Sequence, residues 1–127
     1  MKISELPRVA AGFPSPAESY MEAGIDLNKE LIRHPSATYF VRVEGDSMID
    51  AGIFSGDVLI VDKALKAKSG DVVIAILHGE FTVKRLEHTA EGYRLLPENT
   101  AYPPIPVPEG SDFAIWGVVV YCIHRVV

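Results

Sequence analysis

A repeated tetrapeptide places two sharp turns directly before two apolar segments of strand length. Ser-Gly-Asp-Val occurs at residues 55–58 and again at residues 69–72, and each copy leads into a run of valine, isoleucine, leucine or alanine. Glycine and aspartate favour turns, whereas short apolar runs rich in β-branched residues favour buried strands. The repeat therefore predicts a turn followed by a strand, twice, and constrains the middle of the chain to a β architecture.

The flanking segments continue this pattern. Side chains alternate between two faces from Thr38 onward, which predicts a strand that ends at Gly45. The tripeptide His-Gly-Glu at residues 78–80 is typical of a tight turn, so the apolar segments on either side of it are expected to pair as a hairpin, residues 72–77 with residues 81–86. Two further strands are expected to complete the sheet, at residues 93–96 and 113–127.

Prolines shape the segments outside the predicted sheet. Four prolines in the first third of the chain disfavour helix, so residues 1–18 are predicted to form an extended arm. A short helix is predicted at residues 27–33, because Asp26 can cap its amino end and Pro35 stops it. Residues 102–108 contain four prolines and cannot form a central strand. We interpret them as a stiff loop, with a ligand for proline-binding domains as the alternative.

Length and charge limit the classes of function. A chain of 127 residues suffices for one modest core. Its 12 basic and 17 acidic residues give a net charge of −5, which argues against a broad basic face for nucleic acid or anionic membranes. The amino terminus lacks the apolar run of a signal peptide, and no segment has the ~20 apolar residues that cross a bilayer. We therefore expect a cytoplasmic, mostly β, single-domain protein without direct nucleic-acid or membrane binding.

Residues that commonly bind metals or cofactors give no coherent pattern. The four histidines, His34, His78, His88 and His124, are widely spaced and form no HExxH motif, and the glycines occur singly rather than in a phosphate-binding loop. Cys122 is the only cysteine and lies in an apolar strand pattern, where a thiol is expected to pack as a small hydrophobe. Neither a metal site nor a cofactor is expected.

One serine and one lysine remain as candidates for chemistry. Ser47 follows a predicted strand in Gly-Asp-Ser-Met, where glycine allows a sharp turn that can direct backbone amides toward an oxyanion. Lys84 shares a strand face with Thr82 and Leu86. Lysine acts as a general base only when neutral, which burial favours, and the Thr82 hydroxyl can orient the amine. The alternatives are an ordinary turn serine and an exposed strand lysine; a serine with a neutral lysine is a known nucleophile and base.

These residues also give the chain a resemblance to a known family. Ser47 in Gly-Asp-Ser-Met, Lys84 in Phe-Thr-Val-Lys-Arg-Leu, the Ser-Gly-Asp-Val turns and Leu-Leu-Pro-Glu-Asn at residues 95–99 resemble the self-cleaving LexA and UmuD family. The likeness covers nearly the whole chain and, through residues 10–20, is strongest to the UmuD branch. Because only 11 residues precede Gly12, the helix-turn-helix domain of a LexA repressor is not expected.

The resemblance implies a reaction of the chain on itself. Ser47 would attack the carbonyl of Ala11 and break the Ala11–Gly12 bond, with Lys84 as the base and the backbone amides of Asp46 and Ser47 as the oxyanion hole. Small residues suit a narrow cleft, and a tethered substrate has a high effective concentration. The implied organisation is a removable leader, an arm with a short helix, and a β-domain like those of LexA and signal peptidases, at residues 1–11, 12–36 and 37–127 respectively.

The resemblance further implies partners in the SOS response to DNA damage. A RecA filament on single-stranded DNA would stimulate cleavage, the shortened form would join the catalytic subunit of an error-prone translesion DNA polymerase, and both forms would be homodimers. One alternative is a catalytically idle β-domain that only dimerises and docks, with Ser47 and Lys84 as relics. A membrane-bound peptidase of the signal-peptidase type shares the chemistry, but the missing anchor argues against it.

Overall fold

The computed structural model describes residues 6, 8–13 and 24–127, in two compact units, Met1–Pro35 and Ser36–Val127. The first unit contains helix α1 (Leu27–Leu31), whose amino end is capped by the Asp26 carboxylate, as predicted. The helix is shorter than the predicted residues 27–33, because Ile32 already adopts extended backbone. Most of the predicted extended arm lies outside the described residues; residues 8–13 have no regular secondary structure.

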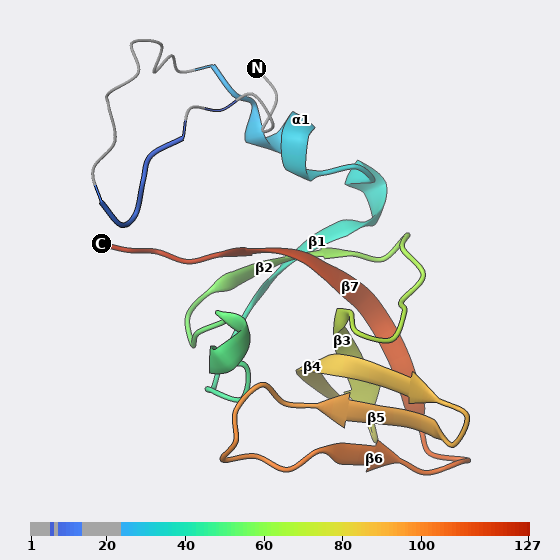
Figure 1. Ribbon diagram of the computed structural model, residues 1–127. Helices are drawn as coiled ribbons and strands as arrows, with labels where there is room; N and C mark the ends of the chain where they lie inside the picture. Colours follow the sequence, from blue (N-terminus) through green and yellow to red (C-terminus); the bar gives the residue numbers. More distant parts are fainter. Residues whose placement is uncertain (1–5, 7, 14–23) are drawn as a thin grey trace. The chain divides into compact units, whose positions relative to one another are not determined.

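The second unit is built on one antiparallel sheet of seven strands, which confirms the mostly β prediction (Figure 1). The strand order is β1-β2-β7-β3-β4-β5-β6, and both Ser-Gly-Asp-Val turns lead into strands, β2 and β3. Two short 3₁₀ turns, η2 (Pro35–Ala37) and η3 (Ile49–Ala51), flank β1. The strands are β1 (Thr38–Arg42), β2 (Val58–Asp62), β3 (Val72–Leu77), β4 (Glu80–Thr89), β5 (Gly92–Leu96), β6 (Ile105–Val107) and β7 (Phe113–Ile123).

The predicted hairpin of residues 72–77 and 81–86 is present as β3 and β4. Leu77 pairs with Glu80, so only His78 and Gly79 form the turn. Both have positive φ, 51° and 79°, which matches the right-handed twist of the paired strands. The hairpin places the long strand β4 in the middle of the second half of the sheet, between β3 and β5.

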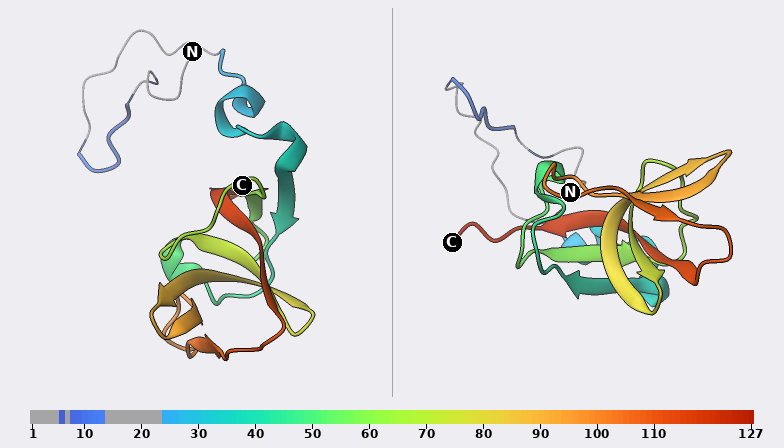
Figure 2. Two further views of the ribbon diagram at one scale, coloured as in Figure 1. Left: turned by 90° about the vertical axis from the view of Figure 1, so that its right-hand side faces the viewer. Right: turned by 90° about the horizontal axis from the view of Figure 1, so that it is seen from below.

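The last strand, β7, joins the two halves of the sheet. It pairs with β2 on one side and with β3 on the other, so it completes the sheet from the inside (Figures 1 and 2). Each pairing contains one irregularity: β7 has an unmatched residue, Val120, opposite β2 and another, Trp116, opposite β3. Such bulges bend a strand and redirect side chains, and Trp116 is consequently directed into a cleft described below.

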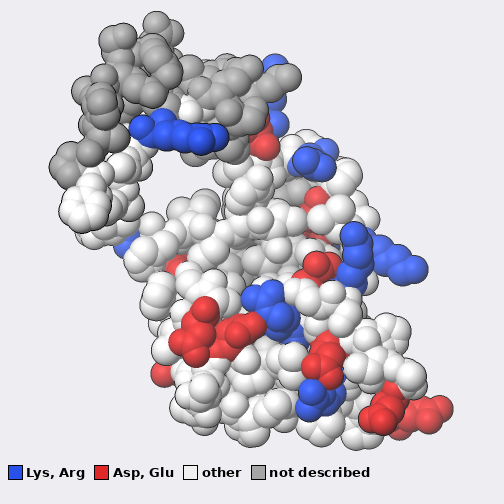
Figure 3. All heavy atoms as spheres, viewed as in Figure 1, with Lys and Arg blue, Asp and Glu red and all other residues white. Residues whose placement is uncertain are grey.

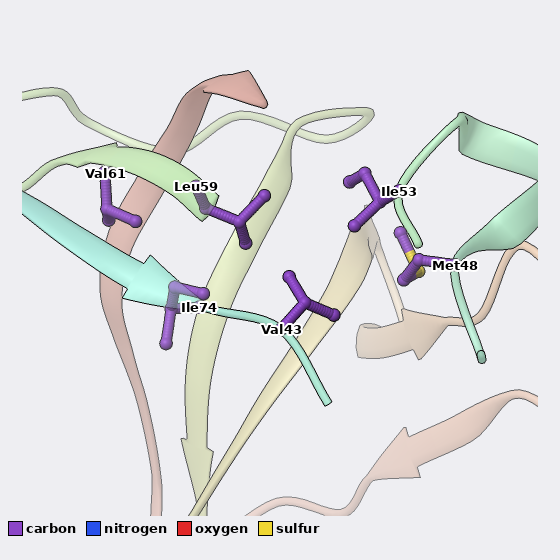
Figure 4. Packing of buried hydrophobic residues seen from close by; sticks show 6 residues of the cluster. All are labelled: Val43, Met48, Ile53, Leu59, Val61 and Ile74. Atoms are coloured by element: carbon purple, nitrogen blue, oxygen red, sulfur yellow. The ribbon is translucent and has the colours of Figure 1, made fainter. Parts of the chain in front are cut away.

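The sheet buries two apolar clusters, because successive residues of β3 point to opposite faces. Ile74 contributes to one cluster, while Val73 and Ala75 contribute to the other. In the first cluster, shown in Figure 4, side chains of the strands meet three residues from the connection between β1 and β2, Val43, Met48 and Ile53. This cluster therefore anchors a loop as well as the sheet. Its buried members are Val43, Met48, Ile53, Leu59, Val61 and Ile74.

The prediction of a stiff loop at residues 102–108 is wrong for part of this segment. We expected a loop without strand, but Ile105–Val107 forms β6, which pairs with β5 at the edge of the sheet. An edge strand needs only one row of hydrogen bonds, so Pro106 can face away from the ladder.

The prediction that Cys122 packs as a small hydrophobe is wrong, because the residue is exposed. Its thiol donates to the buried Asp57 carboxylate, 3.3 Å away, which also accepts from the amide of Phe54 and contacts the His124 ring. Burial by itself raises the pKa of Asp57, but these hydrogen bonds outweigh burial and lower it. Desolvation and the same carboxylate raise the pKa of Cys122 to about 11, so the thiol stays protonated.

A substitution at Gly117 tests the close packing of β7 against β2. A Cβ added at this position would lie 2.5 Å from Cγ1 of the fully buried Val61. We expect Gly117→Ala to lower the free energy of unfolding by about 1–3 kcal/mol, measured by urea denaturation. Ala114→Val adds carbon to an exposed position of the same strand and serves as the control, with little change expected. An unchanged midpoint in Gly117→Ala would contradict the packing described for β7.

Candidate active site

Ser47 lies in a tight turn directly after β1. We call residues 45–48 the Ser47 turn. Gly45 adopts φ of 96°, a conformation that side chains disfavour, and its amide donates to the Ser55 hydroxyl. The next residue along from the serine, Met48, is only 2% exposed and packs in the first apolar cluster. The Met48 carbonyl accepts from the amide of Ile53, another buried residue. The serine is therefore attached to the core through its neighbour.

Lys84 reaches the serine from β4. Its amine Nζ lies 3.0 Å from Ser47 Oγ, 2.7 Å from Thr82 Oγ1 and 3.1 Å from the carbonyl oxygen of Val83. The residue is only 8% exposed, and Leu86 on the same strand face is fully buried. The alternation of β4 thus places Lys84, Thr82 and Leu86 on one face, as predicted. The alternative of an exposed strand lysine is wrong.

The three contacts suit a neutral amine. A neutral lysine has two N–H groups and one lone pair. When two N–H groups donate to Thr82 Oγ1 and the Val83 carbonyl, the lone pair remains for the proton of the Ser47 hydroxyl. Burial lowers the pKa of Lys84 below the ordinary lysine value of ~10.4. Within the described residues, Lys84 forms no ion pair with a carboxylate that would restore the charged form.

A cleft of about 530 Å³ opens beside the Ser47–Lys84 pair. Both residues line it, together with apolar and aromatic side chains from β1, β3, β4 and β7. Trp116, the unmatched residue of β7, contacts the rings of Tyr39 and Phe81 at this wall, with centroids 5.2 and 6.0 Å apart. Arg42 and Glu44 also line the cleft, which can therefore accept an extended segment of polypeptide with small or apolar side chains toward the apolar wall. Its apolar lining consists of Val41, Val43, Met48, Ile74, Phe81, Val83 and Trp116.

The loop between β5 and β6 holds the Ser47 turn in place. The amide of Glu98 donates to the Ser47 carbonyl at 2.8 Å, and the side-chain amide of Asn99 donates to the Asp46 carbonyl at 2.8 Å. The Tyr102 hydroxyl donates to the Asp46 carboxylate, and this hydrogen bond raises the pKa of Tyr102. Sequence reasoning quoted Pro-Glu-Asn only as part of a resemblance and missed these contacts. They join residues about fifty positions apart, which no local pattern reveals.

The predicted oxyanion donors are also in the Ser47 turn. Neither the Asp46 amide nor the Ser47 amide donates a hydrogen bond to another described residue, so both are available to a ligand. The predicted cleavage residues, Ala11 and Gly12, lie in an exposed bend of the first unit.

Two other classes of site are absent from the described part of the chain. Among these residues, no group of three or more His, Cys, Asp or Glu side chains is arranged to hold a metal ion. No helix within the same residues has the length and apolar character needed to cross a membrane.

Comparison with known proteins identifies the family. The family model of peptidase S24-like proteins matches residues 3–120. The chain belongs to the peptidase S24-like family. Members of this family are serine peptidases, and the relatives of the chain confirm its resemblance to the LexA and UmuD proteins.

Three relatives illustrate this membership. SamA of Salmonella typhimurium strain LT2 is 52% identical over 118 residues, which cover 93% of this chain and 81% of SamA. MucA of Escherichia coli is 46% identical over 119 residues, with 93% and 81% covered. LexA repressor 1 of Xanthomonas campestris is 45% identical over 118 residues, which cover 92% of this chain but only 57% of the repressor. These relatives support membership of a self-cleaving group of serine peptidases associated with the SOS response.

The substitution Lys84→Met tests whether burial of the lysine amine lowers the stability of the folded protein. Burial of the lysine amine costs free energy of folding at every pH below the ordinary lysine pKa, so we expect the variant to melt at a higher temperature than the parent near neutral pH. Between the lowered folded pKa and the unfolded value of ~10.4, the unfolded chain binds more protons than the folded one. The parent therefore gains stability as pH rises, and the difference in melting temperature between Lys84→Met and the parent should narrow toward pH 10. A variant that melts at the same temperature as the parent at every pH would argue against a desolvated amine.

Proposed function

We propose that this protein is a self-cleaving serine peptidase in which Ser47 is the nucleophile, Lys84 is the general base and the Ala11–Gly12 bond is the substrate. The observation that carries this proposal is the 3.0 Å contact between the serine hydroxyl and a buried lysine amine, in a chain of the S24-like family. Burial favours the neutral amine, which is the form that can accept a proton.

The first half of the reaction forms an acyl-enzyme. Lys84 Nζ accepts the hydroxyl proton as Ser47 Oγ attacks the carbonyl carbon of Ala11. The amides of Asp46 and Ser47 stabilise the negative charge on the former carbonyl oxygen. The C–N bond then breaks, Gly12 leaves as a free amine, and the proton on Lys84 passes to that leaving nitrogen. Thr82 Oγ1 and the Val83 carbonyl hold the other N–H groups of the lysine throughout.

The second half releases the leader. Water replaces the departed amine, gives a proton to Lys84 and attacks the ester carbon of Ala11. The ester bond to Ser47 Oγ breaks, the serine regains its proton from Lys84, and the leader departs with a carboxylate at Ala11. The products are residues 1–11 and a protein that begins at Gly12.

Self-cleavage should depend strongly on pH. A larger fraction of Lys84 is neutral at alkaline pH, so incubation of the purified protein at pH 9–10 should yield the form beginning at Gly12, detected by intact mass. We expect the rate to reach a plateau with a midpoint below the ordinary lysine pKa of ~10.4. Ser47→Ala should remain uncut, and Lys84→Ala should be slowed by at least ~100-fold.

Two outcomes would contradict this proposal. An unchanged mass in the parent protein would favour the idle docking domain instead. Cleavage of Ser47→Ala at the parental rate would assign the cut to a contaminating peptidase.

We also propose partners for the processed form. The names of relatives, the family and the SOS theme support a cytoplasmic protein that forms homodimers, responds to a RecA filament on single-stranded DNA, and serves as the accessory subunit of an error-prone translesion polymerase. The net charge of −5 is compatible with protein partners rather than direct nucleic-acid binding. On the face seen in Figure 3, basic and acidic side chains are interspersed over the sheet rather than gathered by sign.

The RecA filament can be tested at neutral pH. A smaller fraction of Lys84 is neutral at this pH than at alkaline pH, so unaided cleavage should be slower. Addition of RecA, single-stranded DNA and a slowly hydrolysed ATP analogue should accelerate formation of the Gly12 form at least ~10-fold, since each tenfold requires only ~1.4 kcal/mol of preferential binding to the reactive state. Omission of the DNA is the control. Equal rates with and without the filament would remove RecA from the proposal.

A further inference from the structure

The peptide group between Asp46 and Ser47 contains the Ser47 N–H, which is a predicted oxyanion donor, and the Asp46 carbonyl, which accepts a hydrogen bond from Asn99. In a planar trans peptide the C=O and N–H bonds point in opposite directions. The carbonyl of Asp46 accepts from Asn99 Nδ2 at 2.8 Å and, at the longer distance of 3.4 Å, from the amide of Ile49. Whatever fixes the direction of this carbonyl therefore fixes the direction of the Ser47 amide. That amide donates to no described residue and is free for a ligand.

Asn99 is itself held in one orientation. Its Oδ1 accepts from the amide of Ala101 at 3.0 Å, and its backbone carbonyl accepts from the amide of Tyr102 at 3.1 Å. With Oδ1 used as an acceptor, the Nδ2 group is directed at the Asp46 carbonyl. The donor thus has little freedom left to lose when a reaction begins, which is the condition for effective preorganisation.

The neighbouring residue ties the same loop to the strand that carries the lysine. Glu98 donates its amide to the Ser47 carbonyl and accepts from the amide of Asp50. Its carboxylate pairs with Arg85, which directly follows Lys84 on β4 and also donates to the Gly70 carbonyl. The loop therefore contacts both elements of the Ser47–Lys84 pair.

We infer that Asn99 is a positioning residue for the oxyanion hole: its side-chain amide holds the Asp46 carbonyl and thereby directs the Ser47 amide at the reacting carbonyl oxygen. The inference rests on the proposed self-cleavage and assigns a role to a side chain that is outside the Ser47–Lys84 pair. Asn99 touches no reacting atom. It acts through the peptide bond that it holds.

Asn99→Asp removes this donor with little change of shape. The aspartate can still accept from the Ala101 amide, but it cannot donate to the Asp46 carbonyl. Asn99→Ser is an uncharged companion whose hydroxyl can accept from Ala101, and it keeps the test available if aspartate prevents folding. Asn28→Asp makes the same chemical change at an exposed position of α1 and is the matched control.

The measurement is the self-cleavage rate of each full-length variant as a function of pH, below its melting temperature. We expect Asn99→Asp and Asn99→Ser to lower the alkaline plateau at least ~10-fold, because loss of one oxyanion donor costs ~100–1,000-fold and a misdirected donor retains part of its effect. The midpoint of the uncharged Asn99→Ser variant should stay within ~0.3 pH units of the parent, about 0.4 kcal/mol, whereas the new carboxylate of Asn99→Asp can itself raise the midpoint. Asn28→Asp should match the parent in both respects.

The pH profile separates positioning from loosening of the site. If Asn99 only stabilised the fold, its loss would admit water to Lys84 and move the midpoint upward toward the ordinary lysine value. A plateau equal to that of the parent, or an upward-shifted midpoint with a recovered plateau in Asn99→Ser, would overturn the inference. Failure of the parent itself to cleave would instead overturn the proposed function, so the two failures are distinguishable.

Discussion

The burial of one lysine amine against one serine hydroxyl is the interaction on which the rest of the site depends. An ammonium in a nearly dry position is costly, and no carboxylate among the described residues pairs with Lys84 to offset that cost. In the part of the chain that the structure describes, its hydrogen-bond partners are the Thr82 hydroxyl, the Val83 carbonyl and the Ser47 hydroxyl. A fold optimised only for stability would not keep a lysine here. Its presence is therefore a stronger indication of chemistry than the serine, which sits in a turn of ordinary composition.

The surrounding structure restricts both members of this pair. The serine is attached to the apolar core through Met48 and to the β5–β6 loop through the carbonyls of its turn. The lysine lies on an inner strand of the sheet, β4, where it pairs with Val73 of β3, and the pairing of β4 with β5 begins at the next residue, Arg85. Neither side chain has to move far to form the 3.0 Å contact, so little ordering entropy remains to be lost during a reaction.

Local patterns predicted the parts of the site that depend on local geometry. Alternation along residues 81–86 placed Lys84 with Thr82, because a strand has a period of two whatever its neighbours are. The same reasoning failed for Cys122 and for residues 102–108, where exposure and edge pairing depend on which strands lie alongside. The contact of Asn99 with the Ser47 turn joins residues separated by 53 positions in the chain and is set by the sheet order. Features that depend on the pairing of distant strands could therefore not be predicted from local sequence patterns.

The place of β7 in the sheet determines when the sheet can be completed during synthesis of the chain. This strand comes last among the described strands, yet it lies between β2 and β3. A chain emerging from the ribosome has no strand at this position until residues 113–123 are free of it. The Ser47 turn then belongs to one incomplete half of the sheet and Lys84 to the other. The serine and the lysine are therefore brought into one continuous sheet only after β7 has been made, and a chain that stops before residue 113 lacks the strand that brings the halves together.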